Sequence, residues 1–378
     1  MSTESCVQVL HMNGGAGDTS YARNATPPLK VMMKAKPIME ESIKKMLERI
    51  IPSPSCFRIA DLGCSSGVHA FIAASNIIDT IGMVAEEATI SSNNTNNSNE
   101  KPPTFQIFLN DLFGNDFNTL FKLIPGFLKE KRKADGLCFF NATPGNFYGR
   151  LFPSRSIHFF FSSFALHWLA QAPKEIKGEI QLPLDERSNV YLTNKAPPSY
   201  KGQFKKDLHL FLRSRSDEIV PGGAMLLTLI GRYDTSDFIS VPGIFHQVII
   251  DMALQNIIET AKSESLRFPL YHPTAKEIQE MIDEEGSFKI ESLESLRVCW
   301  DGSNLNQDGS DNDLYSLVDV RKRGVFLTRY TRSVFEPLLK AQLGQGLMDE
   351  VFLRFQNKVI QFMDRLEYPI LVLSLFVK

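Results

Sequence analysis

The chain contains the segment Phe57-Arg58-Ile59-Ala60-Asp61-Leu62-Gly63-Cys64-Ser65-Ser66-Gly67, which is the best single guide to its fold. Ile59 and Ala60 supply the apolar part of a short buried strand, and this strand ends in the carboxylate of Asp61. The two glycines adopt backbone angles closed to other residues and leave room for a ligand beside the main chain. A helix is predicted over residues 68–78. Strand, glycine turn and helix together predict a nucleotide-like ligand at the carboxyl end of a parallel sheet.

The spacing of these glycines excludes two common phosphate-binding loops. Ser65 stands two residues after the first glycine, so the dinucleotide pattern G-x-G-x-x-G is absent, and no phosphate loop ending in Gly-Lys-Ser/Thr follows. A ligand without phosphates fits better. The form D-x-G-x-x-x-G resembles the adenosyl-methionine loop of class I methyltransferases, and an ordinary strand–helix turn is the alternative.

A second acidic strand end supports a ligand that carries a ribose. Residues 105–112 read as a strand that ends in Asp111, and a carboxylate there accepts hydrogen bonds from both ribose hydroxyls. The interval between the glycine turn and this acid is long. Residues 88–103 account for the excess, because their Ser- and Asn-rich composition predicts a disordered surface loop.

Composition excludes several classes of protein. The 378 residues are 43% hydrophobic and 22% charged, with a net charge of −2 and no cluster of basic residues, so a nucleic-acid partner is not expected. The amino terminus lacks the features of a signal peptide, and no apolar run has the length of a membrane helix. Five cysteines without C-x-x-C spacing indicate neither a disulfide framework nor a zinc site. We therefore expect a cytoplasmic protein that does not bind a membrane.

Predicted strands and helices alternate along the chain, as in a doubly wound α/β sheet. An amphipathic helix is expected over residues 39–51, with Pro37 just before it. Further expected elements are strands over 156–161, 224–230 and 370–377 and helices near 204–212 and 349–363. The stretches 173–212 and 234–285 do not fit the sheet economically, and we expect them to form a helical cap that excludes water from the site.

With these residues established, the chain resembles the plant SABATH methyltransferases, which methylate salicylate, benzoate, jasmonate and xanthine alkaloids. The resemblance covers nearly the whole chain and rests on residues 9–22, 60–67, 109–118, 147–153, 167–173, 220–223 and 336–339. It implies a class I, Rossmann-like methyltransferase with a mostly parallel, doubly wound sheet and an α-helical cap. The expected parts are an N-terminal lid segment (1–52), a methyltransferase core (53–170, 213–232 and 286–378) and the cap (171–212 and 233–285).

The resemblance implies a site for S-adenosyl-L-methionine. Its expected residues are Tyr21, Asp61, Gly63, Cys64, His69, Asp111, Leu112, Asn146, Phe147 and Ser163. Three positions depart from the usual family pattern: Val68-His69 replaces Pro-Asn, Asn146 replaces Ser before the adenine-stacking Phe147, and Ala25 stands where many members have Ser. Asn146 still forms hydrogen bonds and His69 is polar, so we expect altered contacts rather than lost binding.

The resemblance also implies an acceptor pocket, which departs more from the pattern. Its expected residues are Asn13, Pro28, Phe164, His167, Trp168, Gln247, Thr331 and Tyr368. Pro28 replaces a Gln that holds the substrate carboxylate in related enzymes, and Phe164 replaces a Tyr. The indole N–H of Trp168 still donates to an anionic or carbonyl oxygen. Two alternatives stay open: His167 and Trp168 as ordinary core residues, and His246 with Gln247 on a solvated helix face.

These features favour methyl transfer to the carboxylate of a small or alkaloid-type acid, and the product is then a methyl ester. A carboxylate is already an anion at neutral pH, so no catalytic acid or base is assigned. The alternative is N-methylation of a xanthine-type alkaloid with assistance from His167, and a less favoured one is a non-catalytic cofactor-binding module. Plain salicylate is not expected with Pro28 and His167 in place.

No metal is expected. Residues 308–313 imitate the start of a calcium loop, but Asp313 stands where the sharp turn needs glycine. Some family members hold magnesium near the site, and the corresponding positions here are Glu186, Glu264, Leu266 and Arg267. The guanidinium of Arg267 argues against a cation there. The expected partners are a small-molecule acceptor and a second copy of the chain in a homodimer.

Overall fold

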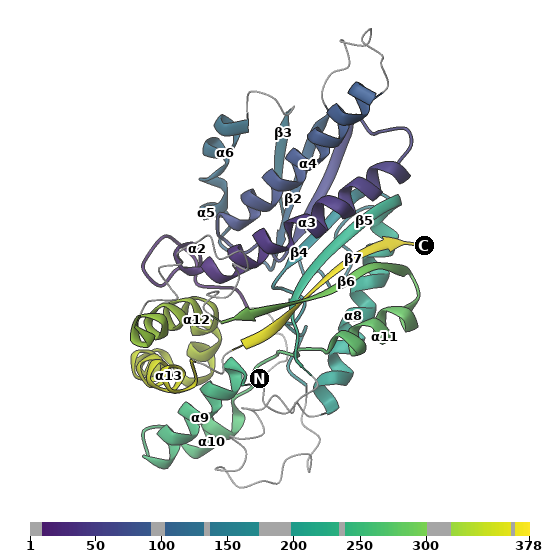
Figure 1. The fold of residues 1–378 in the computed structure, drawn as a ribbon. Coiled ribbons are helices and arrows are strands. Elements are labelled where there is room, and N and C mark those ends of the chain that lie inside the picture. The colour runs from purple at the N-terminus through teal and green to yellow at the C-terminus, as the bar shows by residue number, and fades with distance from the viewer. Residues whose placement is uncertain are drawn as a thin grey trace.

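The computed structural model describes residues 10–91, 103–131, 137–173, 198–233, 239–300, 319–363 and 367–378, without the side chains of 88–91. These residues form a seven-stranded sheet with the strand order β3-β2-β1-β4-β5-β7-β6 (Figure 1). The strands are β1 (Cys56–Leu62), β2 (Thr104–Asp111), β3 (Cys138–Pro144), β4 (Ile157–Ser163), β5 (Ile219–Ile230), β6 (Phe288–Cys299) and β7 (Glu367–Val377). The neighbouring strands β3, β2, β1, β4 and β5 pair in parallel, whereas β7 runs antiparallel to both β5 and β6. The predicted mostly parallel α/β sheet is confirmed.

The strand order places a ligand crevice between β1 and β4. The chain leaves β1 toward β2 and β3 on one side and returns to β4 and β5 on the other, so the connecting segments diverge at the carboxyl ends of β1 and β4. A ligand of an open α/β sheet binds at such a switch point. The Asp61 carboxylate lies on β1 at this edge, and Asp111 is the last residue of the adjacent β2.

Helices cover both faces of the sheet. They are α2 (Tyr21–Asn24), α3 (Thr26–Arg49), α4 (His69–Ser91), α5 (Phe117–Phe121), α6 (Ile124–Lys131), α8 (Pro198–Glu218), α9 (Val241–Leu254), α10 (Thr260–Ser265), α11 (Ala275–Glu285), α12 (Val320–Leu343) and α13 (Met348–Phe362). Neighbouring strand residues enter opposite layers: Phe159 packs in one cluster with α3 and α4, and Phe160 packs in the other with α8 and α11. This alternation is the period of a strand buried on both faces.

The first long helix differs from its prediction. Helix α3 begins at Thr26, and Pro37 lies inside it rather than before it. Pro27 and Pro28 occupy its first turn, where a missing N–H has no helical partner to lose. Farther on, the buried Met39 and Met46 continue the apolar stripe past Pro37. The predicted start of this helix, just after Pro37, was therefore wrong.

The expected cap also differs from the observed packing. Phe204 and Phe211 of α8 pack against the sheet with Phe160, so residues 198–212 belong to the layer that covers the sheet. The helices grouped beyond the carboxyl ends of the strands are α9, α10, α12 and α13 (Figure 1). Phe245 of α9 stacks on Phe355 of α13, with 4.3 Å between ring centroids, so two segments far apart in sequence share one apolar core. The remaining boundaries of lid, core and cap stay predictions.

Smaller differences concern element ends. Helix α4 continues to Ser91, into the segment expected to be a disordered loop, and residues 92–102 lie outside the described part. Strand β5 begins at Ile219, earlier than the expected start at residue 224, and Gly222 within it has a φ of 81°. No helix in the described part of the chain has the length and apolar character to cross a membrane.

Candidate active site

The first cavity lies at the carboxyl ends of β1, β2 and β4. It contains about 700 Å³ of unoccupied space, part of it open to solvent. The predicted residues that line it are Tyr21, Gly63, Asp111, Leu112, Asn146, Phe147, Phe164, Trp168 and Ser163. Gly63 has a φ of 82°, and a Cβ there would come within 2.4 Å of the Ala165 Cβ. Only glycine therefore fits at this turn, and its bare main chain faces the cavity.

The glycine turn is fastened to β2 through its main chain. The carbonyl of Asn110 accepts from the N–H groups of both Gly63 and Cys64, each at 2.9 Å. The Asp111 carboxylate accepts from the Ser65 N–H through Oδ2 and from the Leu112 N–H through Oδ1, both at 2.8 Å. Asn110 was not predicted as a site residue, although it directly precedes the predicted acid. These bonds fix the distance between the glycine turn and the Asp111 carboxylate.

Two acids at this edge, the buried Asp61 and the half-buried Asp111, have raised pKa values. Burial, with the charge of Asp111 as a second cause, raises the pKa of Asp61 to about 8. Burial raises the pKa of Asp111 to about 6, although the N–H groups of Ser65 and Leu112 oppose the shift. A cation brought to this edge would favour the ionised form of both carboxyls. The site is thus electrostatically prepared for a positively charged ligand.

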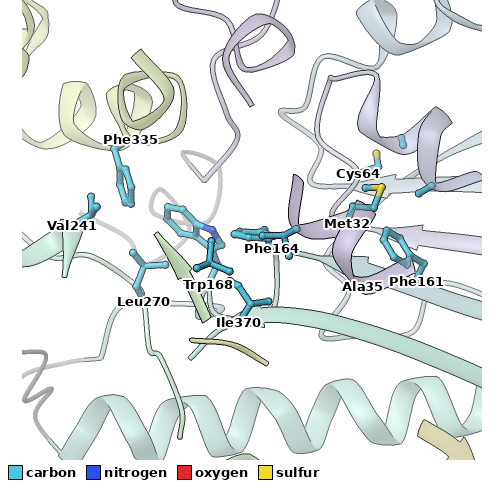
Figure 2. Packing of buried hydrophobic residues seen from close by; sticks show 14 of the residues in the cluster. Met32, Ala35, Cys64, Phe161, Phe164, Trp168, Val241, Leu270, Phe335 and Ile370 are labelled. Atoms are coloured by element: carbon cyan, nitrogen blue, oxygen red, sulfur yellow. The ribbon is translucent and has the colours of Figure 1, made fainter. Parts of the chain in front are cut away.

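The second cavity lies beside the first and has a mainly aromatic and apolar lining. It contains about 570 Å³ of unoccupied space, part of it open, and the predicted residues that line it are Phe164, His167, Trp168, Thr331 and Tyr368, with Tyr21 from the cofactor set. Figure 2 shows Trp168 between Phe335 and Phe164, with Leu270 and Ile370 close by. The hydroxyl of Tyr148 donates to the backbone carbonyl of Trp168 and holds it in place.

Four residues line both cavities: Met12, Tyr21, Phe164 and Trp168. The two spaces therefore adjoin along these four residues. A group bound in one cavity lies next to a group bound in the other. This adjacency is what transfer of a small group between two ligands requires.

Both imidazoles in the second cavity are buried and neutral. Burial lowers the pKa of His167 well below its usual value, and the neighbouring His272 adds to the shift. Burial lowers the pKa of His272 to about 4, with the charge of Arg232 as a second cause. Their ring centroids are 5.7 Å apart. These rings offer hydrogen bonds at neutral pH, but they are weak bases.

The N-terminal segment lies over both cavities, because Leu10 and Met12 line the first and Met12 and Tyr21 line the second. Its Asn13 donates to Glu336 Oε2 at 2.8 Å through the side chain and to the Ser333 carbonyl at 2.9 Å through the backbone. The N–H of Tyr21 in turn donates to the Asn13 carbonyl at 2.8 Å. Asn13 thus fastens the segment to α12.

Several predicted residues lie outside the lining of these two cavities as described. Asp61 and Cys64 are buried just behind the glycine turn, and Asn13 faces α12. Pro28 is buried in the first turn of α3, and Gln247 is half-buried on α9. His69 is buried at the start of α4, where its Nε2–H donates to the Ala25 carbonyl at 2.6 Å. It thereby joins the glycine turn to the N-terminal segment.

Sequence reasoning missed part of the lining. In the first cavity the missed residues include Ser65 and Ala165, and in the second they include Leu270, His272, Trp300 and Phe335. Ser65 and Ala165 lie next to predicted residues, so proximity in sequence was an available signal. The missed residues of the second cavity are isolated apolar, aromatic or histidine positions without a local pattern.

Within the described residues, no group of three or more His, Cys, Asp or Glu side chains could hold a metal ion. Arg267 donates through Nη1 to the carbonyls of Glu264 and Leu266 at 2.6 and 2.8 Å. Its guanidinium thus occupies the main-chain oxygens at that place. Glu186 and the acidic stretch 308–313 lie outside the described residues.

Comparison with known proteins decides the family. A model of the S-adenosyl-L-methionine-dependent carboxyl methyltransferases matches residues 7–378. The chain belongs to this family. Its relatives include a protein from Coffea canephora named probable caffeine synthase, 38% identical over 360 residues that cover 92% of this chain and 91% of that one. The jasmonate O-methyltransferase of Arabidopsis thaliana is 35% identical over 394 residues, covering 98% of each chain.

A solved structure supports the same conclusion. Loganic acid methyltransferase with S-adenosyl-homocysteine (SAH) superimposes with a TM-score of 0.77 at 26% identity, covering 97% of this chain and 98% of that one. The predicted family, fold class and methyltransferase activity are therefore confirmed. The roles expected of individual residues stay predictions, and they are taken up as proposals below.

Proposed function

We propose that the first cavity binds S-adenosyl-L-methionine, which supplies a methyl group on a positively charged sulfonium sulfur. Three features support the fit: the exposed main chain at Gly63, the Asp111 carboxylate at the end of β2, and the ring of Phe147 in the wall. Asp111 would hold the ribose hydroxyls, and Phe147 would pack on the adenine. The raised pKa values of Asp61 and Asp111 suit a ligand that brings positive charge.

We propose that the second cavity binds the methyl acceptor and that the acceptor is the carboxylate of a small or alkaloid-type acid. The observation that carries this proposal is the absence of an effective base among the described lining residues, where no Asp or Glu occurs and both histidines have lowered pKa values. A carboxylate arrives ionised at neutral pH and needs no proton removed. The adjoining cationic sulfur complements its charge.

The protein's contribution in this proposal is alignment and dehydration. Trp168, which lines both cavities, would donate its indole N–H to a carboxylate oxygen. Tyr148 fixes the Trp168 backbone through its hydroxyl. Phe164 and Phe335 would exclude water from the reacting atoms. These residues place the acceptor oxygen without taking part in a proton transfer.

N-methylation of a xanthine-type heterocycle is the second candidate. Two observations favour it: a 3,7-dimethylxanthine N-methyltransferase of Coffea arabica is 36% identical over 354 residues, and no Lys or Arg occurs among the described lining residues of the second cavity. A neutral purine avoids the desolvation of an unpaired anion. Its N–H proton must then leave, however, and His167 is a weak base.

Incubation with methyl-labelled adenosyl-methionine separates the two candidates. One panel holds small and alkaloid-type carboxylic acids, and the other holds xanthines. We expect labelled product from an acid, and mild alkali should release its label as methanol because the product is an ester. An alkali-stable product formed only from xanthines would contradict the carboxylate proposal. Calorimetric titration of SAH tests the cofactor site separately, and a lack of binding would contradict it.

The homodimer is a further proposal. It rests on the family resemblance, and light scattering coupled to size-exclusion chromatography measures the mass directly. A monomer mass across the concentrations used for assay would contradict it. The cytoplasmic location stays a prediction.

A further inference from the structure

The segment 145–153 carries three residues that line the first cavity, Asn146, Phe147 and Tyr148, yet it contains no helix or strand. Such a segment has buried main-chain donors and acceptors without a ladder to satisfy them. Asn146 satisfies one donor locally, because its Oδ1 accepts from the Tyr148 N–H at 3.0 Å. The Gly145 N–H donates to the Asp111 carbonyl, and several of the other groups find their partners at the end of α8.

Arg215 and Glu218 in the last turn of α8 form an ion pair that is fully buried, with both side chains 0% exposed. The Nε–H of Arg215 donates to Glu218 Oε2 at 2.7 Å. The guanidinium lies 5.4 Å from the centre of the Phe160 ring and 5.3 Å from that of Phe211. A buried ion pair alone is weak evidence for stability, because desolvation offsets the attraction between the charges. Its other contacts indicate what it does here.

The other side-chain hydrogen bonds of the pair go to the main chain of the loop, and the Arg150 guanidinium lies 3.4 Å from Glu218 Oε1. Arg215 donates through Nη1 to the Phe147 carbonyl at 2.6 Å and through Nη2 to the Gly149 carbonyl at 2.8 Å. Glu218 Oε1 accepts from the N–H groups of Leu151 and Phe152 at 2.6 and 3.0 Å. One planar guanidinium and one carboxylate thus fix four main-chain groups within six consecutive residues.

The same helix supports the ring that these bonds orient. Phe147 packs edge-on against Phe211 of α8, with 5.8 Å between ring centroids and an interplanar angle of 88°. Its carbonyl is held by Arg215, one helical turn farther along α8. Both the backbone and the ring of Phe147 are therefore held by contacts with α8.

We propose that Arg215 and Glu218 are positioning residues for the cofactor, which hold Phe147 and Asn146 at the distance and tilt that the adenine requires. This inference rests on the proposed placement of adenosyl-methionine in the first cavity. The two residues act through the loop, since neither lines the cavity as described. Their loss should weaken cofactor binding and leave acceptor binding nearly unchanged.

A double-variant cycle tests the proposal. Calorimetry measures the dissociation constant of SAH for the wild type, Phe147→Ala, Arg215→Met and the double variant. We expect Arg215→Met to weaken binding by about tenfold or more, since hydrogen bonds from a charged group are lost. Because Arg215 acts through Phe147, the double variant should bind within about threefold of Phe147→Ala alone. Effects that multiply in full would overturn the proposal.

Controls separate positioning from general stability. Arg213→Met changes a neighbour on α8 whose side chain is 69% exposed, and its SAH affinity should equal that of the wild type. At saturating adenosyl-methionine, the acceptor KM of Arg215→Met should change less than about twofold. A lower melting temperature with unchanged SAH affinity would show a purely structural role and overturn the proposal.

Glu218→Gln provides a second route if Arg215→Met does not fold. It keeps an oxygen for the Leu151 and Phe152 N–H groups but removes the charge that orients the guanidinium. SAH binding should weaken by about threefold or more, and unchanged affinity would overturn the proposal. If the wild type itself binds no SAH, the cofactor site fails and the inference fails with it. If the wild type binds and the variants bind equally well, only the inference fails.

Discussion

The two cavities of the site are built differently, although they share four residues. Apart from the N-terminal segment, the cofactor cavity takes its residues from between Gly63 and Ala170, at or after the carboxyl ends of β1, β2, β3 and β4. The acceptor cavity gathers side chains from the N-terminal segment, the segment after β4, the end of β5, α9, α12, β7 and the connections between them. The first surface follows from backbone geometry and the second from tertiary packing. Substitutions should therefore separate the two functions.

Asp111→Ala should give the largest and most one-sided effect. It removes the proposed partner of the ribose hydroxyls and also the oxygens that accept from Ser65 and Leu112 at 2.8 Å. We expect SAH binding to weaken by about 1.5–3 kcal/mol, or roughly ten- to a hundredfold. Calorimetry measures this. Asp283→Asn, on the exposed side of α11, should have no effect. Equal losses in both variants would remove the assignment of the ribose site.

Trp168→Phe tests the acceptor side. The substitution keeps an aromatic ring between Phe164 and Phe335 but removes the indole N–H that we assign to the substrate carboxylate. We expect kcat/KM for the acid to fall about tenfold, the lower range for a hydrogen bond to a charged group. SAH affinity should change much less. If instead SAH binding falls as far as acceptor turnover, Trp168 supports both cavities equally and the separation fails.

The same contrast explains what the sequence could predict. Gly63 and Asp111 could be singled out in the sequence because a strand end and a tight turn restrict the residue types that fit; both line the first cavity, and their roles toward the cofactor stay predictions. His272 and Trp300 were missed because each reaches the acceptor cavity only through long-range packing. Pro28 was expected beside the acceptor, but it lies in the first turn of α3. A motif match gave its position in the alignment and not the direction of its side chain.

Helix assignment failed for a related reason. Pro37 was interpreted as a helix start because proline usually breaks a helix interior. In the structure α3 passes through it, with Met39 and Met46 buried beyond. Residues 286–378 were expected in the core, and Phe245 of α9 packs against Phe335 of α12 and Phe355 of α13; the division into core and cap stays a prediction. Local propensity predicts that helices exist, whereas their partners depend on the whole fold.

Asp61, behind the glycine turn, and the histidines of the acceptor cavity predict pH dependences of opposite sign, because the lowered pKa values of His167 and His272 make the unfolded state bind more protons than the folded state below about pH 6.5. The pKa of Asp61 is about 8 in the folded protein and near 3.8 when unfolded, so the folded state retains a proton that the unfolded state loses. The contribution of Asp61 to the free energy of unfolding should therefore fall as pH rises from about 4 to 8. Asp61→Asn cannot lose this proton, and between pH 5 and pH 8.5 its free energy of unfolding should fall by about 4 kcal/mol less than that of the wild type. Urea unfolding at pH 5 and pH 8.5 measures the difference, and parallel curves would contradict the shift.

His69→Phe should give the smallest effect, and it should reach both cavities. His69 donates to the Ala25 carbonyl at 2.6 Å, and its ring lies 5.9 Å from that of Tyr21, which lines both spaces. Phenylalanine keeps a ring but leaves the Ala25 carbonyl without this donor, at a cost of about 0.5–1.5 kcal/mol.

Because Tyr21 precedes Ala25 by one turn of α2, its displacement should raise the KM values of adenosyl-methionine and of the acceptor by similar factors, about two- to fivefold. His209→Phe is the matched control, since His209 bonds to the Met281 carbonyl at 3.1 Å on the opposite face of the sheet. It should lower the melting temperature without changing either KM. If only the adenosyl-methionine KM rises in the His69 variant, the N-terminal segment serves one cavity alone. Tyr21, which lines both cavities, would then not couple them.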